Sequence, residues 1–176
     1  IPGITMGLFA AEKSNGTQEL LLTSPITIWE LVLGKFLAAA AFVALLVALL
    51  AVFPALLFLY GDPEIGKTLA GLGALLLVGL VYAAIGAFAS SVTQSQLIAF
   101  FLAFVLLLVL WMLGFLADLG AADGAMASDT VGNLLRWLST AEHFESMVMG
   151  LVETKDLVYF AVLTMGFLVL TKTTVE

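Results

Sequence analysis

TLAGLGALLLVGLVYAAIGAFA, residues 68–89, is a run of apolar and small residues without any charged side chain. A helix needs about 20 such residues to cross a hydrocarbon core about 30 Å thick. Residues 36–60 and 97–117 form two further runs of this kind, and the shorter run 157–171 crosses if Lys172 reaches the interface. Isolated strands leave backbone groups unpaired in lipid. We therefore predict an all-α, polytopic membrane helix bundle with four spans in a single transmembrane domain, residues 1–176.

The composition excludes several classes of protein. The chain has 176 residues, of which 62% are apolar and 11% charged, whereas soluble domains are about half apolar and a quarter charged. It has no cysteine, so disulfides and thiolate metal sites are excluded. The net charge of −7 argues against nucleic acid as a partner through a basic patch. The lipid bilayer is the partner that the composition predicts.

The segment before the first long run contains its own helix signals. Residues 1–11, IPGITMGLFAA, are too few to span a membrane, and we interpret them as the end of a helix whose beginning is missing from this chain. Thr27 and Glu30 have the spacing of a capping box. A helix is therefore predicted to begin at Thr27 and to continue into the first span.

Residues 118–156 form a long segment that is expected to contain short amphipathic helices. Ser139 and Glu142 have capping-box spacing, and a face of apolar residues follows: Phe144, Met147, Val148 and Leu151. A helix at the membrane interface and an ordinary surface helix packed on the bundle both fit this pattern. The single histidine, His143, does not share a helical face with Glu142 and Glu145. We predict a histidine on the helix surface and no metal site.

GDPEIGKT, residues 61–68, matches the phosphate-loop pattern G-x-x-x-x-G-K-[ST]. A phosphate loop follows a strand, whereas a predicted membrane span precedes this one. Its acidic residues Asp62 and Glu64 would also repel a phosphate. We interpret the segment as a turn after which a helix begins at Thr68.

The chemistry of the spans points away from an enzyme. No charged residue occurs from Thr68 to Ala117, or within 36–60 and 157–171. Proton and ion relays place ionisable groups inside the bundle, so a gradient-driven carrier is disfavoured. No serine elbow, cysteine nucleophile or separated His and Asp pair is present. We predict a protein without a catalytic site or cofactor of its own. A membrane scaffold that anchors an ATPase or an extracytoplasmic assembly is the alternative to a transporter subunit.

Small residues recur at four-residue spacing on two spans, where they allow helix backbones to approach closely. They are Gly79, Ala83 and Ala87 on one span, and Ala40, Ala44 and Ala48 on the other. Packing within the bundle and packing between two copies both fit these stripes.

The stretch MGLFAAEKSNGTQELLLTSPITIWELVLGKFLAA, residues 6–39, resembles the membrane subunits of ABC-2 type transporters. The resemblance is to the permeases associated with gliding motility and to those of nitrous-oxide-reductase maturation in particular. The residues that match are Glu12, Lys13, Gly16, Thr17, Glu19, Leu21, Leu22, Ser24, Pro25, Gly34 and Lys35. A weaker similarity covers residues 139–160.

The resemblance implies a permease of the type V exporter-like ABC-2 fold in the bacterial cytoplasmic membrane. It implies six helices, the first absent from this chain, and a second permease as partner, identical or related. Residues 12–35 would be a cytoplasmic segment that couples the permease to a separate ABC ATPase, which binds ATP and Mg²⁺. The coupling residues carried over are Glu12, Lys13, Gly16, Thr17, Glu19, Leu21, Leu22 and Pro25.

Only the resemblance sets the orientation. Three lysines fall in the predicted inner segments, Lys13, Lys35 and Lys172, and three basic residues in the outer ones, Lys67, Arg136 and Lys155. The positive-inside rule is therefore tied.

Overall fold

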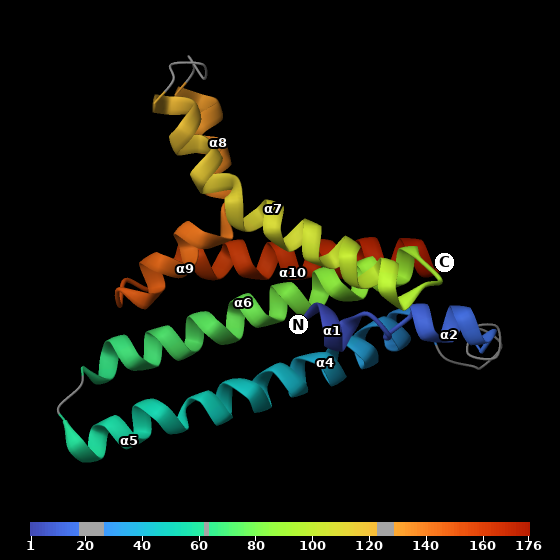
Figure 1. Ribbon diagram of the computed structural model, residues 1–176, viewed down its shortest axis with the longest axis horizontal. Coiled ribbons are helices and arrows are strands. Elements are labelled where there is room, and N and C mark those ends of the chain that lie inside the picture. Colours follow the sequence, from blue (N-terminus) through green and yellow to red (C-terminus); the bar gives the residue numbers. More distant parts are fainter. Residues whose placement is uncertain (18–26, 62–63, 123–128) are drawn as a thin grey trace.

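The computed structural model describes residues 1–17, 27–61, 64–122 and 129–176, and every regular element in these ranges is an α-helix (Figure 1). The helices are α1 (Pro2–Thr5), α2 (Ala10–Asn15), α4 (Ile28–Leu50), α5 (Val52–Tyr60), α6 (Ile65–Val92), α7 (Gln96–Ala122), α8 (Asp129–Leu138), α9 (Thr140–Val148) and α10 (Thr154–Val175). Four stretches are long and apolar enough to cross a membrane: Ile28–Phe58, Ile65–Val92, Gln96–Leu119 and Thr154–Val175. The predicted all-α membrane bundle is confirmed.

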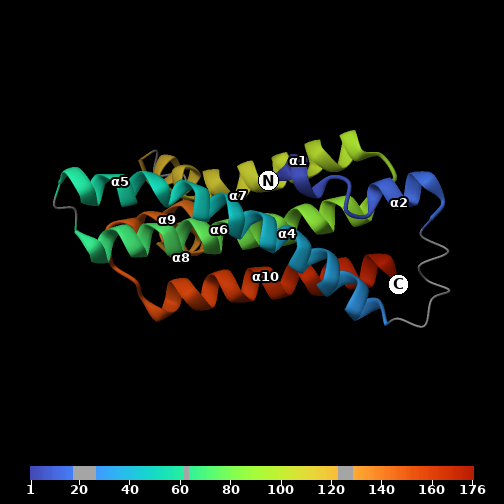
Figure 2. The same ribbon diagram turned by 90° about the horizontal axis from the view of Figure 1, so that it is seen from below.

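Helix α6 is the centre of the bundle. It packs against α4, α7, α9 and α10, and it runs beside α10 in both views (Figures 1 and 2). In its most apolar window 56% of the residues are buried, compared with 11% in the Ile28–Phe58 span. The four long stretches therefore differ in role: α6 is enclosed by protein, whereas α4 and α5 expose most of their side chains.

The small residues of α6 make this close packing possible. Gly79, Ala83 and Ala87 are all buried within the chain. A Cβ atom at Gly79 would overlap the side chain of Val43 on α4, so only glycine admits that contact. Ala44 and Ala48, on the other predicted stripe, are exposed. The first stripe thus packs inside the bundle.

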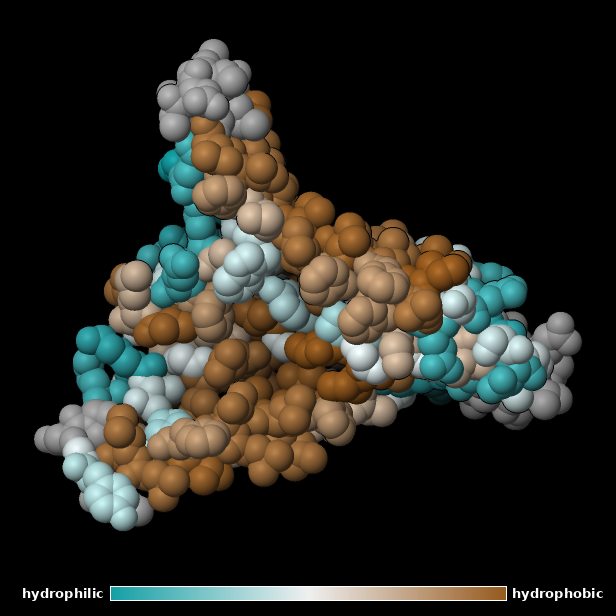
Figure 3. Space-filling view, viewed as in Figure 1, coloured by the Kyte–Doolittle hydropathy of each residue, from teal (hydrophilic) through white to brown (hydrophobic). Residues whose placement is uncertain are grey.

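The surface is divided between apolar sides and polar ends. Apolar residues cover the visible sides of α4, α5 and α7, and hydrophilic residues gather at both ends (Figure 3). Helix α2, the link between α6 and α7, and the C-terminus lie at one end, whereas α8 and α9 lie toward the other (Figure 1). This distribution is the one that a membrane-spanning bundle requires. We call these two ends the α2 end and the α9 end.

Several helix boundaries differ from the sequence prediction. The predicted span 36–60 is divided at Ala51, because Pro54 has no N–H to donate to the carbonyl four residues earlier. Helix α6 begins at Ile65, not at Thr68, and Glu64 precedes it. Lys67 therefore lies in the first helical turn, where it pairs with Glu64 at 2.6 Å. The arrangement is a helix start and lacks the strand that leads into a phosphate loop.

The segment between α7 and α10 departs most from expectation. Helices α7 and α8 pack as a hairpin that projects from the bundle (Figure 1). Ser139 precedes α9 but makes no capping hydrogen bond, so the predicted capping box with Glu142 is wrong. Its side chain packs instead close to Gly114 of α7. His143 is 6% exposed, so the prediction of a surface histidine is also wrong.

Candidate functional site

The most elaborate set of polar contacts at the α2 end joins α2 to two of the long helices. Residues 1–11 do not form one continuous helix as predicted, because the chain turns between α1 and α2 at Met6–Phe9. Phe9 and Ala10 are buried there, at 2% and 0% exposure. The start of α2 therefore needs hydrogen-bond acceptors that are not water.

Ser90 of α6 supplies the acceptor. Its Oγ atom accepts hydrogen bonds from the backbone N–H groups of Phe9 and Ala10, both at 3.0 Å. The same hydroxyl donates to the carbonyl of Met6 at 2.8 Å. An N-cap serine accepts hydrogen bonds from the first N–H groups of its own helix. Ser90 does the same for α2, although it belongs to α6. This contact explains why the N-terminal segment turns at this point.

Two lysines complete the attachment of α2. Lys35 of α4 forms a salt bridge with Glu12 and donates to the carbonyl of Leu8. Its ammonium group also lies 4.5 Å from the centre of the Phe9 ring, within cation–π range. Lys13 donates to the carbonyl of Ser91 on α6. Helix α2 is therefore tied to α4 through one lysine and to α6 through the other.

The end of α2 presents an exposed tip. Gly16 terminates the helix in the left-handed conformation, with φ of 70°, which glycine adopts at little cost. The N–H of Thr17 donates to the carbonyl of Glu12 at 3.0 Å, and so satisfies one of the last carbonyls. Residues 14–17 are exposed. We call these four residues, Ser14 to Thr17, the α2 tip.

Helix α4 begins with a capping box formed by Thr27 and Glu30. The Thr27 N–H donates to Glu30 Oε2 at 2.8 Å, and the Glu30 N–H donates to Thr27 Oγ1 at 3.3 Å. The helix then continues past Lys35 into the bundle. Glu12 and Lys35 consequently connect the capped end of a long helix to α2.

The structure brings together only part of the predicted coupling residues. Glu12 and Lys13 reach different long helices, and Gly16 and Thr17 form the tip. Glu19, Leu21, Leu22 and Pro25 lie outside the described residues. Sequence reasoning missed Ser90, which lies directly after the predicted span 68–89. The signal was the pair of adjacent serines, Ser90 and Ser91, at the end of an otherwise apolar run.

A second buried polar cluster lies at the α9 end. Nδ1 of His143 is 2.6 Å from Asp156 Oδ1, and Nε2 is 2.9 Å from the carbonyl oxygen of Trp137. The two ring nitrogens of His143 therefore lie between a carboxylate and a backbone carbonyl. Asp156 also accepts from the hydroxyl of Ser146 at 3.1 Å. The cluster fastens α9 to the start of α10 and explains why His143 is buried.

One comparison with known proteins assigns the chain to a family. A family model described as "ABC-2 family transporter protein" matches residues 3–174. Searches of curated proteins and of solved structures found no match. The family match extends from α1 into the last turn of α10, and it covers all four candidate spans together with α2 and its anchors. The chain therefore belongs to the ABC-2 family of transporter proteins, of which it is a permease membrane domain.

Proposed function

We propose that this permease is driven by a separate ABC ATPase that docks on the α2 tip, and that it exports a substrate along a path shared with a second permease. As an ABC-2 permease domain, the chain has no catalytic site and no cofactor of its own. The energy for transport must then come from the partner.

The observation that carries the proposal is the attachment of α2. Its tip is exposed, whereas its body is held by Ser90 and Lys35. The side chain of Lys35 is 15% exposed and that of Glu12 is 31% exposed, so water screens this pair less than a surface ion pair. A displacement of the tip would therefore be passed to α4 and α6 rather than absorbed by a loose loop.

The exposure of α4 and α5 supports a second permease as partner. Only 11% of the most apolar window in Ile28–Phe58 is buried within the chain. Large side chains such as Phe42, Leu49 and Phe53 are exposed there. In a membrane this surface contacts either lipid or another helix bundle, and the exposed Ala44 and Ala48 would permit close helix packing. We assign this surface to the contact with the second permease.

Binding of the ATPase can shift the permease only if its affinity for the two conformations differs. The α2 tip suits this role because α2 is attached to two helices whose burial differs. We place the export pathway beside α4, and the ATPase on the cytoplasmic side of the bacterial inner membrane. Within the family, we assign the chain by the resemblance of residues 6–39 to the permeases associated with gliding motility or to those of nitrous-oxide-reductase maturation.

The test separates docking from coupling. The full-length permease is purified in mild detergent with its associated subunits, and ATP hydrolysis and transport into vesicles are measured. The variant Asn15→Arg/Thr17→Arg changes the tip and should lose the ATPase subunit. Lys35→Gln should retain the subunit but lower transport-linked hydrolysis, because α4 no longer follows α2. Glu64→Gln, at the opposite end of the bundle, is the matched control.

Each outcome has a defined meaning. Copurification and hydrolysis that are unchanged in both the tip variant and Lys35→Gln would refute the assignment of α2. An ATPase that copurifies through the tip but drives no movement of any cargo would favour the membrane scaffold. Vesicle transport that is driven by a pH jump without ATP would instead restore the gradient-driven carrier.

A further inference from the structure

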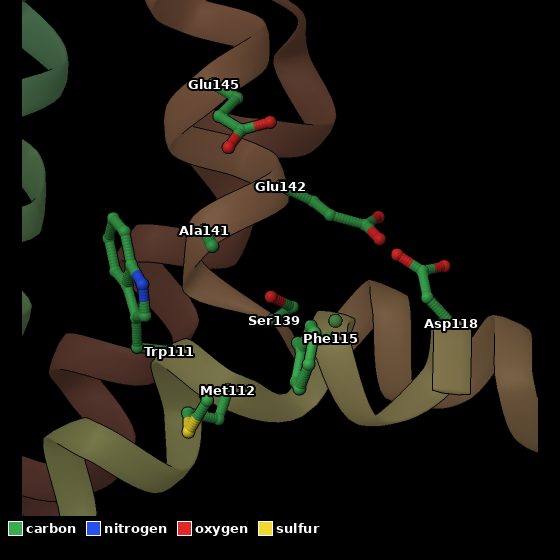
Figure 4. A pocket seen from close by; sticks show the side chains of 9 residues that line it. Trp111, Met112, Phe115, Asp118, Ser139, Ala141, Glu142 and Glu145 are labelled. Atoms are coloured by element: carbon green, nitrogen blue, oxygen red, sulfur yellow. The ribbon is translucent and has the colours of Figure 1, made fainter. Parts of the chain in front are cut away.

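A pocket of about 360 Å³ lies between α7 and α9, away from the α2 end (Figure 4). Its volume is within the range of small-ligand sites, which begins at about 300 Å³. Trp111 and Phe115 form apolar walls, and Asp118, Glu142 and Glu145 supply carboxylates. These side chains come from two helices that the coupling mechanism does not use.

The pocket has more carboxylate side chains than cationic side chains beside it. Arg136 donates to Asp118 at 2.7 Å and lies 3.9 Å from Glu142. Within the described residues no salt bridge includes Glu145. Three carboxylates are therefore balanced by one guanidinium. Figure 4 shows the side chains of Glu142 and Asp118 directed toward each other. The excess of negative charge favours a cationic ligand.

Ser139 provides an independent observation at the same pocket. Its side chain is fully buried, and its Oγ atom has no hydrogen-bond partner in the described part of the chain. Figure 4 shows this oxygen facing the interior of the pocket. Gly114 allows the approach, since a Cβ atom there would lie 2.9 Å from Ser139 Oγ. A buried hydroxyl normally has a partner, so this oxygen is available to accept a hydrogen bond from a bound group.

The lining selects an organic cation over a metal ion. Among the described residues, no group of three or more His, Asp or Glu side chains is arranged to hold a metal. The aromatic walls would also be poor neighbours for a hydrated inorganic ion. An ammonium group, in contrast, has three donors for carboxylate and hydroxyl oxygens, and its apolar attachment can lie on Trp111 and Phe115. Trp111 can add a cation–π contact.

We propose that this pocket binds a primary ammonium group carried on a short apolar chain. Glu142 and Glu145 balance the charge, Ser139 accepts one hydrogen bond after a small movement that opens its hydroxyl to the ligand, and the aromatic side chains contact the apolar part. Trp111 and Phe115 lie in the C-terminal part of the candidate span Gln96–Leu119, and the ends of membrane spans are where lipid headgroups are expected. An ammonium group of this kind occurs both in lipid headgroups and in free alkylamines. The proposed binding does not depend on how the ATPase docks.

The test measures ligand binding to the full-length permease, purified with its accompanying subunits and without nucleotide. Hexylammonium is titrated by calorimetry in detergent, with hexanol as the uncharged probe and Glu64→Gln as the control variant. Charge-assisted hydrogen bonds make up most of the proposed interaction, so Glu142→Gln/Glu145→Gln should bind hexylammonium at least about tenfold more weakly. Ser139→Ala should weaken it about tenfold, by the loss of one hydrogen bond from the charged ammonium group.

A lipid arm identifies the source of the ammonium group. The permease is reconstituted with equal amounts of phosphatidylethanolamine and phosphatidylglycerol, and retained lipids are counted by native mass spectrometry. A preference for phosphatidylethanolamine that the double variant loses would assign the site to a lipid headgroup. Hexylammonium binding without any lipid preference would assign it to a free amine.

Two results would overturn the proposal. One is hexylammonium affinity that stays unchanged in both the double variant and Ser139→Ala. The other is hexanol binding as tight as that of hexylammonium. Because nucleotide and transport are not involved, neither result bears on the ATPase assignment.

Discussion

The cap that Ser90 provides gives the sharpest prediction. The change Ser90→Ala removes the acceptor for two backbone N–H groups, those of Phe9 and Ala10, and the donor to the Met6 carbonyl. Phe9 and Ala10 are 2% and 0% exposed, so water cannot replace the lost hydroxyl without local opening. We expect the start of α2 to become unstable while the rest of the bundle remains folded.

The magnitude follows from the number of orphaned groups. A buried donor without a partner costs about 1–3 kcal/mol, and two are created here. A lost helix cap costs about 0.5–2 kcal/mol in measured cases, since the chain relaxes. We therefore expect local opening of the α2 start to become easier by about 3 kcal/mol. This is roughly a hundredfold change in the opening equilibrium.

Hydrogen exchange followed by mass spectrometry on residues 6–13 measures that equilibrium. Ser90→Ala should raise the exchange rate of the Phe9 and Ala10 amides about a hundredfold. Ser91→Ala is the matched control, because the Ser91 hydroxyl donates at 2.7 Å to Phe88 within α6. That variant should leave the α2 amides within a few-fold of the parent protein. Equal exchange in the two variants would refute the role of Ser90 as a cap.

Two further predictions concern close packing and a buried hydrogen-bonded pair. Gly86→Ala should destabilise the bundle by about 1–3 kcal/mol, because the new Cβ would lie 2.6 Å from Thr5 Cβ. Gly71→Ala is the control, since its Cβ would meet nothing within 4 Å. Equal stability of the two variants in detergent unfolding would contradict this prediction. Asp156→Ala should cost about 1–3 kcal/mol, because the buried Nδ1 of His143 loses its hydrogen-bond partner, and a midpoint of thermal unfolding equal to that of the parent protein would rule this out.

The sequence predicted the spans because hydrophobicity accumulates along a run and needs no knowledge of tertiary contacts. The start of α4 was also predictable, since Thr27 and Glu30 are three residues apart and form their hydrogen bonds locally. The start of α6 was placed three residues too late because no side-chain cap marks it. Local signals therefore found the helices but located only those ends that are fixed by local chemistry.

The polar anchors escaped prediction because their partners are distant in sequence. Ser90 caps a helix that begins 80 positions earlier, at Ala10. Asp156 stood next to a predicted span and gave no sign that His143, 13 positions before it, would fold back against it. In both cases an isolated polar residue at a helix end was interpreted as part of a connection. The partner that gives it a role appears only when helices pack.

The same anchors suggest which helix moves when α2 is displaced. Helix α6 is held on several sides by α4, α7, α9 and α10, so moving it would disturb many buried contacts. Helix α4 packs mainly on α6 and exposes most of its surface, so its displacement breaks fewer contacts. Glu12 and Lys35 connect α2 to this less restrained helix, whereas Ser90 connects it to the more restrained one. We therefore expect α2 to act as a lever that turns against α6 and moves α4.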